Sequence, residues 1–315
     1  MHSRARIVFA GTPEFAVPSL RALLNSPHEV IAVLTQPDRP AGRGRKTAVG
    51  PVKLAALDAD VVVMQPATLR DSSVQQTLRD LQLDLLVVVA YGQLLPPDVL
   101  SIPRIACLNV HASLLPRWRG ASPIQTAVLS GDKETGITLM QMEAGLDTGP
   151  VYCAQRTAIG MHETAGQLHD RLAIMGGELL AANLDAILER ELKPAPQSLA
   201  GITYAGRISK ADGLIDWMQS AIHIDRQIRA FNPWPVAHTH HEGELLRCWS
   251  AIPLGDCSRD GIAAGAVVSV EPRGMVVKTG AGLLLLTEVQ APGKNRVSAA
   301  EYANARNMNG KVLGQ

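Results

Sequence analysis

The first half of the chain alternates short apolar runs with segments of helical periodicity. Five runs rich in Val, Ile and Leu are nearly continuous in hydrophobicity, at residues 6–10, 29–34, 60–64, 85–91 and 106–110. Such runs are typical of strands that are buried on both faces of a parallel sheet. Between them lie helical patterns, for example residues 72–81. The alternation predicts right-handed βαβ units, and therefore a doubly wound, mostly parallel, Rossmann-like α/β domain.

The pattern changes in the second half. Two more strands, at residues 136–143 and 151–159, precede a long amphipathic helix at residues 164–190. A segment with prolines and little periodicity follows, and after it the apolar runs become short and separated by glycines. This change predicts a small C-terminal β-barrel of OB-like form. The expected domains are residues 1–190 and 209–315, with a linker at residues 191–208.

Composition narrows the class of protein. The chain has 315 residues, of which 46% are hydrophobic and 19% charged, as expected for a globular protein of two domains. Its four cysteines form no CxxC pair, so neither a zinc site nor a secreted disulfide framework is supported. No apolar run approaches the length of about 18 residues that a membrane span needs. We therefore expect a cytoplasmic protein without a membrane partner.

Net charge is less informative than its distribution. Lys and Arg number 30 against 29 Asp and Glu, a formal net charge of +1 that neither indicates nor excludes nucleic acid. Residues 35–53 are locally basic, and their prolines and glycines predict a loop without regular structure. Such a loop is either a solvated surface segment or a contact for a phosphate backbone. Its basic side chains include Arg39, Arg43, Arg45 and Lys46.

The most informative polar residues follow the fifth predicted strand. Asn109 and His111 are two positions apart, so both side chains point to one face at the C-terminal end of the strand, where open α/β sheets bind ligands. Downstream, Asp147 lies in a Leu-Asp-Thr-Gly turn. Each residue taken singly is more often structural, because strand-end Asn and His bond nearby backbone and Asp is a common turn former.

Two longer motifs carry a resemblance. NVHASLLPRWRGASPIQ at residues 109–125 and QMEAGLDTGP at residues 141–150 are similar to the signature of the folate-dependent formyltransferases. The resemblance implies that Asn109, His111 and Asp147 form a catalytic trio. It also implies a folate-binding segment, formed by Ser113, Leu114, Leu115 and Pro116. Residues 88–93 leave the C-terminal end of the adjoining strand, where α/β sheets bind ligands, so we expect Tyr91 and Gln93 to belong to a neighbouring wall of the folate site.

Four further blocks, at residues 9–20, 35–46, 88–96 and 228–235, resemble the members of this family that act on methionyl initiator tRNA. The implied reaction moves the formyl group of 10-formyltetrahydrofolate to the amino group of that tRNA, without a metal. The resemblance also implies that the basic loop enters the acceptor arm and that the C-terminal domain helps to hold the tRNA. A monomer is expected, although the sequence does not fix the oligomeric state.

The chemistry of formyl transfer suits these residue types. A negative charge develops on the formyl oxygen, and the carboxamide of Asn109 and the imidazole of His111 can both donate hydrogen bonds to it. The attacking amine must lose a proton. Asp147 either accepts that proton or orients His111, and the sequence leaves both roles open.

Other functions remain alternatives to different degrees. A dinucleotide oxidoreductase would need GxGxxG after the first strand, where this chain has GTPEFA. A non-catalytic RNA-binding module would not explain the trio. A relative that formylates another amine, such as an amino sugar or glycinamide ribonucleotide, would share the trio but not the basic loop.

Overall fold

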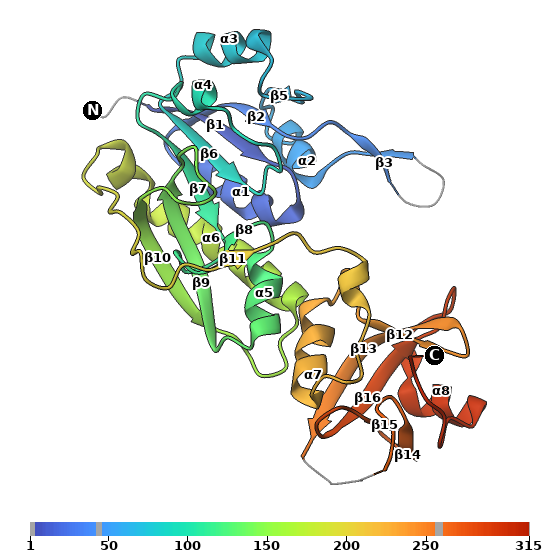
Figure 1. Ribbon diagram of the computed structural model, residues 1–315. Coiled ribbons are helices and arrows are strands. Elements are labelled where there is room, and N and C mark those ends of the chain that lie inside the picture. The colour runs from blue at the N-terminus through green and yellow to red at the C-terminus, as the bar shows by residue number, and fades with distance from the viewer. Residues whose placement is uncertain (1–3, 42–45, 256–260, 315) are drawn as a thin grey trace. The chain divides into compact units, whose positions relative to one another are not determined.

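The computed structural model describes residues 4–41, 46–255 and 261–314 and forms two compact units (Figure 1). The first unit contains most of the chain up to Ala205, and the second contains the chain from Gly206 onward. Residues 124–133 and 159–168 belong to the second unit.

The first unit is built around a seven-stranded sheet of order β10-β9-β7-β6-β1-β2-β5. The five strands from β7 to β5 are parallel, whereas β9 is antiparallel to both of its neighbours. The strands are β1 (Arg6–Gly11), β2 (Glu29–Leu34), β5 (Val63–Met64), β6 (Leu85–Val89), β7 (Ala106–His111), β9 (Glu134–Gln141) and β10 (Val151–Ala158). β6 and β7 are buried at every position. The predicted mostly parallel α/β domain is therefore confirmed.

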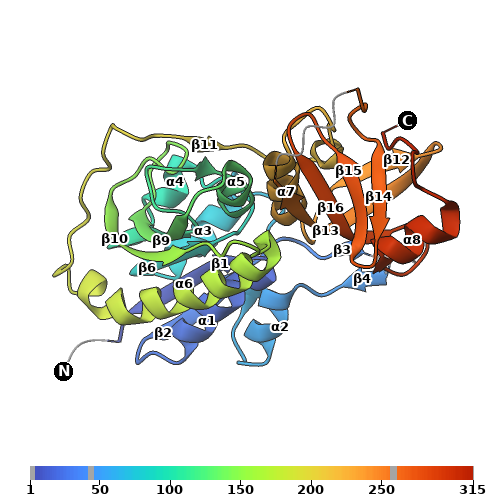
Figure 2. The ribbon, with the colours of Figure 1, turned by 90° about the horizontal axis from the view of Figure 1, so that it is seen from below.

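Helices cover both faces of this sheet, with α1 and α6 on one side and α3 and α4 on the other (Figure 2). Gly177 in α6 allows a close approach, because a Cβ there would lie 2.8 Å from the main-chain oxygen of Pro18 at the start of α1. The helices of the first unit are η1 (Glu14–Ala16), α1 (Val17–Leu24), α2 (Pro51–Leu57), α3 (Ser72–Asp80), α4 (Pro97–Leu100) and most of α6 (Ala165–Leu188). Helix α5 (Pro123–Ser130) belongs, except for its first residue, to the second unit.

The basic segment at residues 35–53 is more regular than predicted. Strands β3 (Arg39–Ala41) and β4 (Lys46–Ala48) pair antiparallel, and α2 begins at Pro51. The expectation of a segment without regular structure was wrong. Gly50 lies directly before α2, and Pro51 occupies the first helical turn, where a missing N–H costs nothing.

The second unit contains a six-stranded antiparallel sheet in which β12, β13, β16, β15 and β14 are neighbours in that order and β17 pairs with β16. Its core consists of buried side chains from α7, α8 and these strands. The elements are η2 (Ala211–Gly213), α7 (Ala221–Ala230), β12 (His238–His241), β13 (Glu244–Leu254), β14 (Val267–Glu271), β15 (Gly274–Lys278), β16 (Leu283–Gln290), β17 (Val297–Ser298) and α8 (Ala299–Arg306). This arrangement agrees with the predicted β-rich C-terminal domain.

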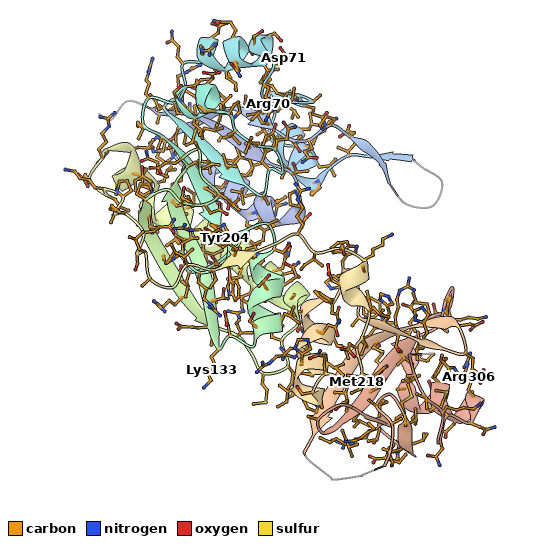
Figure 3. The ribbon with its side chains drawn as sticks, in the orientation of Figure 1. Arg70, Asp71, Lys133, Tyr204, Met218 and Arg306 are labelled. Atoms are coloured by element: carbon orange, nitrogen blue, oxygen red, sulfur yellow. The ribbon has the colours of Figure 1, made fainter. Side chains whose placement is uncertain are left out.

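Between α6 and the second unit, residues 195–205 run back along the first unit; we call them the return segment. Ala195 pairs with Val151 at the start of β10. At its other end, β11 (Tyr204–Ala205) pairs in parallel with β8 (Arg119–Gly120). Figure 1 shows β11 beside β8, and Figure 3 labels Tyr204 there. The chain predicted as a linker thus makes specific contacts with the first unit.

Candidate active site

The structure brings the three predicted catalytic side chains together. Asn109 and His111 project from the end of β7 and are 9% and 6% exposed. The carboxamide Nδ2 of Asn109 lies 3.5 Å from Oδ1 of Asp147, and Nδ1 of His111 lies 3.7 Å from Oδ2 of the same carboxylate. One acidic group therefore faces both side chains.

The turn between β9 and β10 places Asp147. Its φ of 50° is left-handed, a conformation that Asp tolerates better than most residues. Gly149 follows two residues later, where a Cβ would lie 1.9 Å from the main-chain oxygen of Gln141. The glycine therefore lets the turn pack directly on the end of β9 and carry Asp147 toward β7.

Asp147 also accepts a hydrogen bond from the main chain. The N–H of Gly120 donates to Oδ2 at 2.8 Å. This bond is shorter than the contacts to Asn109 and His111, so the backbone at Gly120 sets the position of the carboxylate. A charged acceptor strengthens such a bond relative to a neutral pair. The same Oδ2 atom remains within reach of His111.

The hydrogen bond of His111 identifies which ring nitrogen carries a hydrogen. Nε2 lies 3.0 Å from the main-chain oxygen of Trp118. A carbonyl oxygen only accepts, so Nε2 is the donor. Nδ1 consequently faces Asp147, presenting a lone pair when the ring is neutral and an N–H when it is protonated.

The predicted folate segment follows directly after His111. The side chain of Ser113 is buried and donates to the main-chain oxygen of Arg117 at 2.6 Å. Thr138 on β9 forms two hydrogen bonds with this segment. Its hydroxyl donates to the main-chain oxygen of Ser113 and accepts from the N–H of Leu115. Leu114, Leu115 and Pro116 are half-buried. Their surfaces, rather than the Ser113 hydroxyl, are available to a ligand.

The neighbouring wall at the end of β6 differs in detail from its predicted role. The ring of Tyr91 is 1% exposed and packs in the apolar core, and burial raises the pKa of its hydroxyl to about 12. Its main-chain oxygen accepts from Thr12 at 3.0 Å and from Gln36 at 3.2 Å. Gln93 donates to the oxygen of Pro66 at 2.9 Å. Both acceptor positions of the Tyr91 oxygen are thus occupied, so Tyr91 supports this wall and offers a ligand neither its ring nor its main-chain oxygen.

The predicted tRNA-binding residues fall largely outside the described part. Arg43 and Arg45 lie outside the described residues, and for Arg39 and Lys46 only the backbone of β3 and β4 is described. Near the base of this hairpin, Lys53 donates to Asp38 at 2.5 Å and to Gln65 at 2.7 Å. The hydrogen bond from Lys53 lowers the pKa of Asp38 below its usual value.

Sequence reasoning missed several residues around the trio. Trp118 and Gly120 contribute main-chain groups, which no side-chain motif reveals. Gln197 of the return segment donates to the main-chain oxygens of Asp147 and Gly149. It lies 50 positions from Asp147 in a segment without periodicity, so the sequence carried no signal for this contact.

Two general features complete the description of the site. Among residues 4–41, 46–255 and 261–314, no three His, Cys, Asp or Glu side chains are grouped so that they could hold a metal ion. Within the same ranges, every helix is too short or too polar to cross a membrane.

Comparison with known proteins identifies the family of the chain. Residues 5–184 match the Formyl transferase family, and residues 207–307 match the Formyl transferase, C-terminal domain family. A methionyl-tRNA formyltransferase of Stenotrophomonas maltophilia is 52% identical over 303 residues, covering 96% of this chain and 97% of its own. One of Methylococcus capsulatus is 50% identical over 309 residues, covering 98% and 99%.

A solved structure shares the fold at much lower identity. The N-formyltransferase of Helicobacter canadensis, determined in complex with folinic acid and dTDP-3-aminofucose, is 18% identical with a TM-score of 0.68. The match covers 90% of this chain and 98% of that one. At this identity the likeness supports the fold alone. The family matches cover most of the sequence, and the chain belongs to the formyl transferase family.

Proposed function

We propose that this chain transfers the formyl group of 10-formyltetrahydrofolate to the amino group of methionyl initiator tRNA. The observation that carries the proposal is the convergence of Asn109, His111 and Asp147 on one point, in a chain about half identical over its whole length to methionyl-tRNA formyltransferases. 10-Formyltetrahydrofolate supplies the carbon that the amine attacks.

The residues present fit a formyl donor. The carboxamide of Asn109, the imidazole of His111 and the carboxylate of Asp147 converge beside a half-buried apolar segment that follows β7. Asn109 is directed by its contact with Asp147 and has a second Nδ2 hydrogen for a formyl oxygen. Preorganised donors of this kind stabilise developing negative charge without reorganisation during the reaction.

Asp147 and His111 act together in removing the proton that the attacking amine must lose. The Nε2 hydrogen of His111 is committed to Trp118, so its Nδ1 is the atom that can exchange a proton with Asp147 or with substrate. We assign Asp147 as the proton acceptor, with His111 held beside it. The proton finally passes to the nitrogen that the formyl group leaves, so the reaction balances without a redox step.

The two domains divide the work in this proposal. Residues 1–190 carry the chemistry, and residues 209–315 help to hold the tRNA. In the second unit Arg229, Arg296 and Lys311 each pair with an acidic side chain, at 2.9, 3.9 and 3.0 Å. Such pairing favours a modest contribution to tRNA affinity. Removal of residues 209–315 should weaken tRNA binding while folate binding, measured in parallel, reports whether the first unit stays folded.

The direct test is formyl transfer with purified substrates. The enzyme should convert methionyl initiator tRNA to its formylated form with 10-formyltetrahydrofolate as the donor. An amino sugar nucleotide and glycinamide ribonucleotide serve as competing acceptors. Turnover of either one in preference to methionyl-tRNA would refute the proposed acceptor but leave the proposed formyl-transfer chemistry intact.

A further inference from the structure

The side chain of Gln197 uses all of its hydrogen-bonding groups at the candidate site. Its Nε2 donates to the main-chain oxygen of Asp147 at 2.8 Å and to that of Gly149 at 2.7 Å. Its Oε1 accepts from Nε and Nη2 of Arg119 at 3.1 and 2.7 Å. A primary amide has two donor hydrogens and two acceptor positions, so each one is used.

This pattern fixes the orientation of the amide. If the amide were flipped, its nitrogen would face the guanidinium of Arg119 and its oxygen would face two carbonyl oxygens, and every contact would become repulsive. Gln197 is half-buried, whereas Pro196, Ser198 and Leu199 beside it are exposed. The chain therefore turns this one side chain inward, toward the turn that carries Asp147.

The return segment holds the opposite side of the site as well. Thr203 accepts from the N–H of Trp118 through Oγ1 at 2.9 Å, and its main-chain oxygen accepts from the N–H of Arg119 at 3.0 Å. These contacts fix the main chain at residues 118–120. There the oxygen of Trp118 accepts a hydrogen bond from His111, and the N–H of Gly120 donates one to Asp147. Residues 195–205 thus link the two backbone segments on which the trio depends.

We propose that Gln197 is a positioning residue for formyl transfer: by bonding the main chain at Asp147 and Gly149, it holds the Asp147 carboxylate in register with Asn109 and His111. The inference rests on the catalytic role proposed for Asp147. The left-handed φ of Asp147 is a conformation that persists only where the surroundings enforce it. Gln197 supplies two of the hydrogen bonds that do so.

Two substitutions test this role. Gln197→Met keeps the length of the side chain and removes all four hydrogen bonds. Gln197→Glu places a second oxygen against the two carbonyl oxygens and so removes both donors, while its carboxylate can still accept from Arg119. A displacement of about 1 Å in such a site can lower the rate by about a hundredfold. We expect both variants to lose at least about tenfold in kcat, with KM for both substrates changed less than about twofold.

The control is Gln75→Met. Gln75 is also buried and donates to a main-chain oxygen, that of Leu69 at 3.0 Å, but it lies on α3. This variant should lower Tm without lowering kcat. A purely structural role for Gln197 would give the same result, so the ratio of kcat loss to Tm loss separates the two roles. The pH profile of kcat should also shift in the Gln197 variants, because the position of Asp147 changes.

Wild-type kcat and an unchanged pH profile in Gln197→Glu and Gln197→Met would overturn the inference. Asp147→Asn is measured beside them. If Asp147→Asn is impaired and the Gln197 variants are not, only the inference about Gln197 fails. If Asp147→Asn retains full activity, the catalytic role proposed for Asp147 fails, and the inference about Gln197 fails with it. If the wild-type enzyme does not formylate methionyl-tRNA, the proposed function fails instead.

Discussion

The imidazole of His111 donates its Nε2 hydrogen to the main-chain oxygen of Trp118, at 3.0 Å. This bond turns Nδ1 toward Asp147, so the ring is held at one nitrogen and reactive at the other. We expect the neutral ring to be the Nε2–H tautomer. Long-range ¹H–¹⁵N spectra of labelled enzyme measure this directly, with the His111 signals assigned by their loss in His111→Asn. An Nδ1–H tautomer would contradict the assignment.

Asn109 should matter mainly for the rate of the chemical step. Asn109→Ala removes a donor that meets charge only as it develops, so kcat should fall by about 10²–10³-fold with KM for the donor little changed. Asn183→Ala is the matched control, because Asn183 also donates to a main-chain oxygen, that of Leu179 at 2.8 Å, but within α6. Steady-state kinetics of the two variants should differ in kcat. Equal kcat values would remove Asn109 from the mechanism.

The glycine after Asp147 should be intolerant of a side chain. Gly149→Ala places a Cβ at 1.9 Å from the main-chain oxygen of Gln141, so the turn must move. Overpacking of this kind costs about 1–3 kcal/mol, and here it also displaces Asp147. Gly206→Ala is the control, since nothing lies within 4 Å of its added Cβ. Tm and kcat should both fall for Gly149→Ala and should both stay unchanged for Gly206→Ala. A fall in Tm with normal kcat for Gly149→Ala would show that the turn tolerates displacement.

The α/β fold was predictable because its signals are local. Strands such as β6 are apolar at every position, and a parallel sheet requires that composition whatever its neighbours are. The pair Asn109 and His111 was visible for the same reason, since alternate residues of one strand share a face. Nothing local marks Gln197, whose main-chain partners lie 48 and 50 positions away in two turn residues and whose side-chain partner Arg119 lies 78 positions away.

Other elements were missed because local composition pointed elsewhere. Residues 35–53 contain prolines and glycines that are typical of irregular loops, yet antiparallel pairing of β3 with β4 needs only three residues on each side. The final helix α8 has small side chains and little amphipathic pattern, and it is held by packing and by its Ser298 cap. Its burial depends on strands distant in sequence.

Two of the cysteines should be chemically inert while the protein is folded. Burial raises the pKa of the Cys107 and Cys248 thiols to about 12, and the thiolate is the reactive form. A raised pKa lowers the thiolate fraction at any pH below it. Iodoacetamide at about pH 8 should therefore spare both residues in native enzyme and modify them after unfolding. Mass spectrometry of the labelled peptides measures the extent of modification at each cysteine. Rapid modification of Cys107 in the native enzyme would contradict its burial.

The basic loop should determine binding of the tRNA and have little part in the chemical step. Arg43 lies between two glycines in the sequence, at a position outside the described residues, so this prediction rests on the sequence and on the proposed acceptor. Arg43→Ala should strongly reduce kcat/KM for methionyl-tRNA while folate binding changes little. Arg43→Lys should restore activity only in part if a planar or bidentate contact matters.

A salt series separates the two ways in which Arg43 can contact RNA. A phosphate contact releases counterions. The ratio of kcat/KM for methionyl-tRNA between wild type and Arg43→Ala should therefore fall as salt rises from about 50 to 200 mM. Stacking of the guanidinium on a base depends much less on salt, so the ratio would then persist. Both results keep the loop in the tRNA site. Unchanged tRNA kinetics in Arg43→Ala at every salt concentration would instead make residues 35–53 an ordinary solvated surface segment, and acceptor choice would have to come from elsewhere in the chain.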